Sequence, residues 1–211
     1  MCAEWVKQKC YAQLLTFFIP DERLKNLLFG LGFGLFLIDG IRDFSPLVVT
    51  QDDDIEIVAA TEDDLPALTK MDHQLERHMK TAPIFLYDFE AEESPEETRE
   101  AFLGHGVRTF VARQGDEVIS CIRGVLDHGP GCDLFDTEKS LGIDFAYSDT
   151  AIRKRGTATR LLGRLLEWGH EQGMTRCVVD FEAANLEAQA FWLKHLQPIC
   201  YSVIRRIDER F

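Results

Sequence analysis

The sequence is short of basic residues. It has 211 residues, and its 23 lysines and arginines are outnumbered by 36 aspartates and glutamates, which gives a formal net charge of −13. Proteins that bind nucleic acids gain much of their affinity from cations placed on phosphates, so this deficit argues against a nucleic-acid partner. An acidic surface is instead compatible with a cationic or amine-bearing partner.

Closely spaced metal ligands are also missing. The six cysteines are scattered, and no two of them form the C-x-x-C pair of a zinc site. His73 and His78 are five residues apart, a spacing that does not place both on one face of a helix. The acidic run at residues 52–54 lacks the spaced ligands and the glycine of a calcium loop. We therefore expect no metal site, and cysteines that stay reduced.

Long apolar runs are absent as well. The most apolar stretch, residues 27–38, has 12 residues including three glycines, so it is too short to span a bilayer. The first residues show no basic segment followed by an apolar one, so no signal peptide is expected. With 45% hydrophobic and 28% charged residues, the sequence predicts a soluble cytoplasmic protein without a membrane partner.

A connector divides the chain near residues 45–54, where a serine–proline step precedes the acidic run. The segment before it, residues 1–50, has a strand, helix and strand pattern. The expected elements of this segment lie at residues 11–19, 21–29 and 35–41. The segment after the connector, residues 55–211, has the length of one ordinary domain. We therefore expect a small appendage followed by a single α/β domain.

The larger segment alternates between strand patterns and helix patterns. Thr61 begins a capping box, and Ser94 precedes glutamates that favour a helix N-terminus. A turn at Gly115 and Asp116 between two apolar runs predicts a hairpin. Expected strands cover residues 55–59, 109–113, 117–126, 141–148, 176–181 and 201–207, and expected helices cover residues 61–79, 94–102, 157–172 and 186–196. This order predicts a mixed α/β fold with a central sheet covered by helices.

The most informative stretch is residues 153–159, which read Arg-Lys-Arg-Gly-Thr-Ala-Thr. They follow an expected strand and begin an amphipathic helix, whose first N–H groups have no partner inside the helix. The helix dipole and the adjacent cations favour an anion there, and glycine and alanine let it approach the backbone. A solvated turn with a helix cap is the alternative interpretation.

Two motifs resemble those of the GNAT superfamily of acyl-CoA-dependent N-acyltransferases. Arg153, Gly156 and Ala158 form an R-x-x-G-x-A pattern that is similar to the family's pyrophosphate loop. Residues 185–192, N-L-E-A-Q-A-F-W, are similar to its N-x-x-A-x-x-F/L-Y helix. The resemblance covers about residues 55–207. It implies the GNAT fold, a mixed and mostly antiparallel sheet in which two adjacent parallel strands splay apart to admit the acyl-CoA.

The resemblance also implies an acetyl-CoA site. The splayed strands correspond to residues 141–148 and 176–181, and backbone groups of the first strand would contact the acyl group and the pantetheine. Backbone N–H groups of the loop would hold the pyrophosphate, while the downstream helix would wall the pantetheine arm. The residues implied to bind acetyl-CoA are Ala146, Tyr147, Ser148, Arg153, Lys154, Arg155, Gly156, Thr157, Ala158, Thr159, Asn185, Phe191 and Trp192.

Acyl transfer to an amine needs a base, because a free alkylamine has a pKa of about 10.4 and arrives protonated. Alternation places Asp144 on the strand face that carries Gly142, Ala146 and Ser148, where small side chains leave room for a substrate. Partial burial raises the pKa of such a carboxyl, so Asp144 is our first candidate base, with a solvated surface position as the alternative. Glu182, after the downstream strand, is the second. The opposite face is expected to carry Leu141, Ile143, Phe145 and Tyr147.

The family's frequent general acid is a tyrosine, but Trp192 stands at the matching place in this sequence. An indole N–H donates a hydrogen bond but is no acid near neutral pH. We therefore expect Trp192 to pack against the pantetheine or the core. Tyr147 or Tyr201 could act as the acid instead, although both also suit core or sheet positions.

Residues 5–43 are similar to the last third of a GNAT domain, including the turn at residues 31–34. No pyrophosphate loop precedes them, so we interpret the segment as the end of a partial second repeat. A strand, helix and strand piece cannot bury its own apolar face. Its phenylalanines therefore need cover from the main domain or from a second chain, which makes a homodimer one expected arrangement.

These observations predict an N-acetyltransferase that moves an acetyl group from acetyl-CoA to a primary amine of a small molecule, amino acid or peptide. The acidic charge favours a cationic acceptor. The alternative is a catalytically degenerate GNAT domain that binds acyl-CoA or a protein partner without turnover. The missing tyrosine and the partial repeat favour that alternative.

Overall fold

The computed structural model describes residues 2–49, 52, 54–86, 94–127, 134, 138–150 and 155–207. The chain divides into two compact units. We call residues 42–130 and 137–179 the central unit, and residues 1–41, 131–136 and 180–211 the terminal unit. One strand, β7 (Arg176–Glu182), begins in the central unit and ends in the terminal unit.

The central unit alternates strands and helices as its sequence pattern predicts. Its elements are β3 (Glu56–Ala59), the 3-10 turn η1 (Glu62–Asp64), α3 (Leu65–Met79), α4 (Pro95–Leu103), β4 (Val107–Gln114), β5 (Glu117–Leu126), β6 (Ser140–Ser148), α5 (Thr157–Glu171) and the first part of β7. The expected caps are present: Thr61 N–H donates to the Asp64 carboxylate at 2.9 Å, and Glu97 N–H donates to the Ser94 hydroxyl at 3.2 Å. Gly115 takes a left-handed φ of 60° in the β4–β5 hairpin.

The terminal unit holds both ends of the described chain. Its elements are α1 (Cys2–Lys7), β1 (Ala12–Phe18), α2 (Glu22–Gly30), β2 (Gly34–Arg42, whose last residue belongs to the central unit), α6 (Leu186–His195) and β8 (Gln197–Arg206). The sequence pattern predicts all of these except α1.

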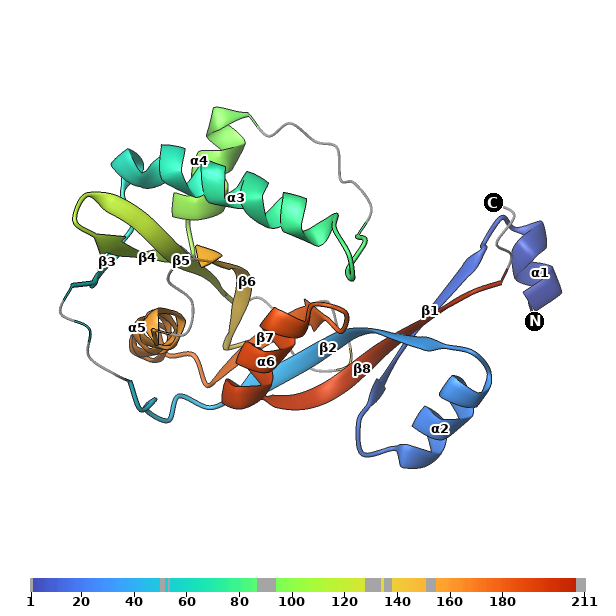
Figure 1. The fold of residues 1–211 in the computed structure, drawn as a ribbon. Coiled ribbons are helices and arrows are strands. Elements are labelled where there is room, and N and C mark those ends of the chain that lie inside the picture. Colours follow the sequence, from blue (N-terminus) through green and yellow to red (C-terminus); the bar gives the residue numbers. More distant parts are fainter. Residues whose placement is uncertain are drawn as a thin grey trace. The chain divides into compact units, whose positions relative to one another are not determined.

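The strands follow the order β1-β8-β2-β7-β6-β5-β4-β3 (Figure 1). The β1–β8, β2–β8, β3–β4, β4–β5 and β5–β6 pairs are antiparallel, and β6–β7 is parallel. The predicted fold class, a mixed and mostly antiparallel sheet with one parallel pair and flanking helices, is therefore confirmed.

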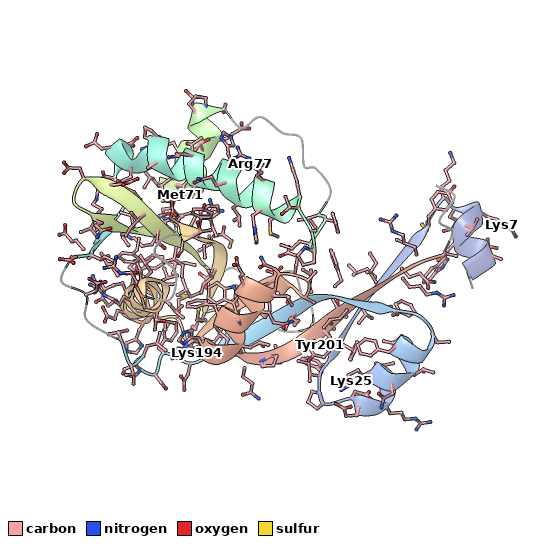
Figure 2. The ribbon with its side chains drawn as sticks, viewed as in Figure 1. Lys7, Lys25, Met71, Arg77, Lys194 and Tyr201 are labelled. Carbon is pink, nitrogen blue, oxygen red and sulfur yellow. The ribbon has the colours of Figure 1, made fainter. Side chains whose placement is uncertain are left out.

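Helices cover both faces of the sheet in the central unit. Helix α5 packs on β4 and β5, whereas α3 and α4 lie on the other face (Figure 1). The spacing of apolar positions in the sequence predicts an apolar stripe on α5 made of Ala158, Leu161, Leu162, Leu165 and Leu166. The four leucines are buried, and Ala158 is partly buried. On the other face, Met71 lies on the side of α3 that faces the strands (Figure 2), and the rings of Phe102 and Phe145 meet edge to face at 5.3 Å.

In the terminal unit, β1 and β2 flank β8, so the N-terminal segment pairs with the C-terminal strand of the same chain. Phe17, Phe33 and Val203 form a buried cluster with Leu28, and Tyr201 packs against it between β8 and α2 (Figure 2). Part of the apolar surface of the N-terminal segment is therefore buried against the C-terminal strand of the same chain. No helix in the described ranges is long and apolar enough to cross a membrane.

Candidate functional site

The N-terminus of α5 differs from those of three other helices. In α2, α4 and α6 a side chain accepts a hydrogen bond from a first-turn N–H group; these caps are Asp21, Ser94 and Asn185. The N-cap of α5 is instead Gly156, which has no side chain and takes a left-handed φ of 86°. The first helical bond runs from Arg160 N–H to the Gly156 carbonyl at 3.0 Å. The first-turn N–H groups of α5 therefore point out of the helix without a capping side chain, which suits an anion.

Thr157 adds a second polar group at this helix end. Thr157 is only 3% exposed, and its Oγ1 has no hydrogen-bond partner among the described residues. A buried hydroxyl without a partner costs about 1–3 kcal/mol. The open helix end, the left-handed glycine and this unsatisfied hydroxyl together fit the oxygen atoms of a diphosphate.

The basic residues before the helix are described in part. Arg155 donates from Nη2 to Asp52 Oδ2 at 2.9 Å. Ala158 and Thr159 lie in the first turn of α5, as predicted. Arg153 and Lys154 lie outside the described residues.

Within the central unit, the parallel ladder joins residues 140–143 of β6 to residues 176–179 of β7. Strand β6 continues to Ser148, and its residues 145–148 pair with β5 on the other side. The predicted pantetheine contacts Ala146, Tyr147 and Ser148 all lie on this second half of β6. The Ser120 hydroxyl lies 2.8 Å from the Tyr147 carbonyl and 2.6 Å from the Ser148 hydroxyl.

A β-bulge interrupts β6 at Asp144. Arg123 of β5 pairs with Phe145, and the next residue, Gly124, pairs with Ile143, so Asp144 is the extra residue. Leu141 packs on α5, because a Cβ added at Gly169 of that helix would lie 2.6 Å from its Cδ2. Phe145 packs instead on Phe102 of α4. The strict alternation expected for residues 141–148 is therefore wrong: the bulge shifts the register by one residue, so Leu141 and Phe145 lie on opposite faces.

The bulge places the first candidate base beside a cation. Asp144 Oδ1 accepts a hydrogen bond from Arg123 Nε at 2.8 Å. The Arg123 guanidinium also lies 4.8 Å from the Phe102 ring centroid and 5.4 Å from that of Phe145. Asp144 is therefore a partly exposed carboxylate with a fixed cationic partner, on the face that α4 covers.

The second candidate base has a different environment, in the terminal unit. Burial raises the pKa of Glu182, and the negative charge of Asp180 raises it further. Asp39 on β2 is 1% exposed, and burial together with Asp180 raises its pKa from 3.8 to about 7. Its Oδ2 lacks a hydrogen-bond partner among the described residues. Sequence analysis missed Asp39, although a lone aspartate inside the apolar run of residues 35–41 was a signal for it.

The predicted residues of α6 also lie in the terminal unit. Asn185 Oδ1 accepts the Ala188 N–H at 3.1 Å, so this side chain caps the helix. The rings of Phe191 and Trp192 lie 4.8 Å apart, edge to face, and Trp192 is buried. Trp192 therefore packs in the core, which is one of the two settings predicted for it. Its contact with pantetheine stays a prediction.

The central unit contains a cavity of about 260 Å³ between α3 and the strands. Its lining has five acidic side chains and two basic ones, Lys70 and Arg113, and Met71 and Tyr147 contribute apolar surface; the acidic residues are Asp63, Asp64, Asp116, Glu117 and Asp149. Its Arg113 is neutralised by an ion pair with Asp64. The chemistry of this lining favours a cation.

Comparisons with known proteins agree with this geometry. The model of the acetyltransferase (GNAT) family matches residues 73–196. The fold is similar to that of an aminoglycoside acetyltransferase from an uncultured soil metagenomic sample, with a TM-score of 0.53 and 15% identity over 68% of this chain and 88% of that one. It is also similar to a GCN5-related N-acetyltransferase from Sphaerobacter thermophilus, with a TM-score of 0.56 and 12% identity over 97% of this chain and 65% of that one. Among curated proteins, none matches the chain by sequence.

Proposed function

The chain belongs to the acetyltransferase (GNAT) family, and on this premise we propose that it is an N-acetyltransferase. It transfers the acetyl group of acetyl-CoA to a primary amine of a small molecule, amino acid or peptide. The observation that carries the proposal is the open N-terminus of α5, where left-handed Gly156 and the buried Thr157 hydroxyl offer polar groups to an anion.

The pyrophosphate of acetyl-CoA is the anion proposed for this helix end. N–H groups of residues 156–159 would donate to its oxygens, and the Thr157 hydroxyl would gain the partner that it lacks in the described chain. Arg155 would supply positive charge, as would Arg153 and Lys154. Residues 146–148 at the end of β6 would contact the pantetheine.

Glu182 is the base that we propose for the acceptor amine. The amine nitrogen bonds to the acetyl carbonyl carbon and its proton passes to the carboxylate, while the bond from that carbon to sulfur breaks and its electron pair leaves on CoA as the thiolate, which takes up a proton to give free CoA thiol. A base works best when its pKa approaches the working pH, and burial moves the pKa of Glu182 in that direction. Asp144 is the second candidate, and its ion pair with Arg123 gives it a competing partner.

The acceptor is proposed to be cationic. Two features support this: the net charge of −13 and the acidic lining of the cavity beside α3. Both lower the free energy of a positively charged molecule near the protein. A panel of a polyamine, an aminoglycoside, lysine and a short peptide would separate small-molecule from peptide acceptors.

The alternative is a GNAT domain that binds acyl-CoA or a protein without turnover. Trp192 favours it, because this buried side chain stands where the family often has a tyrosine acid. Release of free CoA thiol with any amine of the panel excludes this alternative, whereas binding without release supports it.

We also propose that residues 1–50 are the end of a partial second repeat beside a domain at residues 55–211. The support is the antiparallel pairing of β1 and β2 with β8, the C-terminal strand of the same chain. Limited proteolysis with gel filtration tests whether the segment is protected in a monomer or only in a dimer.

The decisive experiment is calorimetric titration of the full chain with acetyl-CoA. We expect binding in the parent and its loss in Gly156→Asp, which adds a side chain and a negative charge at a left-handed position. Gly173→Asp is the matched control, because Gly173 has a left-handed φ of 81° at the other end of α5. Absence of binding by the parent chain, or equal loss in both variants, would overturn the proposal.

A further inference from the structure

The acidic segment before β3 contacts the basic residues at the start of α5. Asp52 Oδ2 accepts a hydrogen bond from Arg155 Nη2 at 2.9 Å. Arg160, in the first turns of α5, donates to the Asp52 carbonyl at 3.1 Å and to the Ile55 carbonyl at 3.0 Å. All these residues belong to the central unit. The sequence predicts only a connector here, but in the structure this segment contacts the start of α5.

Asp52 is held in place through both its side chain and its backbone. Its Oδ1 accepts the N–H of Asp54 at 3.3 Å, and its carbonyl accepts the N–H of Ile55 at 3.2 Å. The side chain is 17% exposed, whereas that of Arg155 is 39% exposed. Asp52 is therefore a fixed negative charge, and Arg155 is the more exposed member of the pair that an incoming anion meets.

We propose that Asp52 is a positioning residue that lowers the affinity of the phosphate loop for CoA. This inference rests on the proposed function, because it assigns a role beside the same site. Asp52 holds the Arg155 guanidinium and offsets its positive charge, so a diphosphate must share that cation with a carboxylate. Weaker binding speeds the release of product CoA, a step that limits turnover in many enzymes.

Replacement of Asp52 by asparagine tests this role. Asp52→Asn keeps the size of the side chain and an oxygen for the Asp54 N–H, but it removes the negative charge. We expect CoA to bind about fivefold more tightly at low salt, a size typical of one partly exposed charge pair. In about 1 M salt, where the Debye length is about 3 Å, the difference should shrink.

Asp54→Asn is the matched control. It makes the same change in net charge two residues away, and its structural contact to Asp52 runs through the backbone N–H, which the substitution keeps. We expect a change in CoA affinity of less than about twofold, because its charge is not paired with Arg155. In steady-state assays, Asp52→Asn should lower the KM for acetyl-CoA and lower kcat, whereas a merely structural role would raise KM.

A double-mutant cycle shows whether the effect acts through Arg155. In the Arg155→Ala background, Asp52→Asn should no longer change CoA affinity. The inference is overturned if Asp52→Asn equals Asp54→Asn, if it weakens CoA binding, or if its effect persists without Arg155. A parent chain that binds no CoA overturns the proposed function as well, so the two failures are distinguishable.

Discussion

Asp144 and Glu182 are two carboxylates that sequence analysis assigns to the same task, and the structure gives them opposite surroundings. Asp144 lies on a β-bulge with the Arg123 guanidinium 2.8 Å away. Glu182 lies at the end of β7, where burial and Asp180 raise its pKa. Both are acidic residues on strands, but Asp144 faces a cation from the neighbouring strand β5, whereas Glu182 is affected by burial and by Asp180 of its own strand.

This difference teaches how a fold assigns chemical roles. A carboxylate that accepts a hydrogen bond from a fixed guanidinium serves well to hold that cation in place. A carboxylate in an apolar setting with an acidic neighbour has more tendency to accept a proton. The roles of base and structural partner are therefore separable by substitution.

The largest expected effect comes from Glu182→Gln. Removal of a general base lowers kcat by about 10²–10⁴-fold. Because the base must be deprotonated, the parent rate should rise with pH through the pKa of Glu182, and the variant should lose that limb. Steady-state rates across a pH series measure both effects. Glu187→Gln on α6 is the control, and we expect it to leave the pH profile unchanged.

Asp39→Asn extends the comparison to a carboxyl whose pKa is raised by burial and by a second carboxyl, that of Asp180. The folded-state pKa of Asp39 is raised from 3.8 to about 7, so the native protein binds the proton more tightly than the unfolded chain does. The stability from this group is complete below about pH 4 and is lost as pH rises through 7. Urea titrations at pH 5 and pH 8 should show a smaller pH dependence in the variant than in the parent. An unchanged dependence would contradict the burial of an ionisable Asp39.

Asp144→Asn should lower the stability of the protein more than its turnover, whereas Glu182→Gln should mainly lower turnover. The substitution leaves the Arg123 guanidinium, 15% exposed and stacked near two aromatic rings, without its carboxylate. We expect a loss of about 1–2 kcal/mol of unfolding free energy and less than a tenfold fall in kcat. Denaturant titration and steady-state kinetics measure the two quantities. If Asp144→Asn instead abolishes turnover while Glu182→Gln remains active, the two roles are exchanged.

Much of this fold could be predicted from local sequence signals. The stripe of Leu161 and Leu165, the caps at Thr61 and Ser94, and the hairpin at Gly115 are all readable within a few residues, and the structure has each of them. Local signals suffice there because the interactions that decide these elements are themselves local.

The remainder depends on contacts that are distant in sequence. The bulge at Asp144 follows from its register with β5, and the pKa of Asp39 follows from the proximity of β2 to Asp180 of β7. The pair of Asp52 and Arg155 joins residues 103 positions apart. No periodicity within one element carries such information, so the sequence nominates Asp144 but gives neither its partner nor the roles of Asp39 and Asp52.

The smallest expected effect concerns a polar group without a partner, and it sharpens the contrast between paired and unpaired groups. Thr157→Val removes the buried hydroxyl that has no hydrogen-bond partner among the described residues. We expect the free energy of unfolding to stay equal or to rise by up to about 1 kcal/mol, because no hydrogen bond is lost. CoA affinity should fall severalfold, because the diphosphate loses a donor.

Thr109→Val is the matched control for Thr157→Val. Thr109 is equally buried, at 2% exposed, but its hydroxyl donates to the Phe102 carbonyl at 2.7 Å. Removing this donor leaves a buried carbonyl unsatisfied, so the same substitution should lower the unfolding free energy by about 1–3 kcal/mol. Because the hydroxyl of Thr109 is already engaged by the protein, CoA affinity should not change. Thermal unfolding and calorimetry of the two variants compare the two threonines directly, and a stability loss in Thr157→Val as large as that in Thr109→Val would show that the Thr157 hydroxyl is already satisfied within the protein.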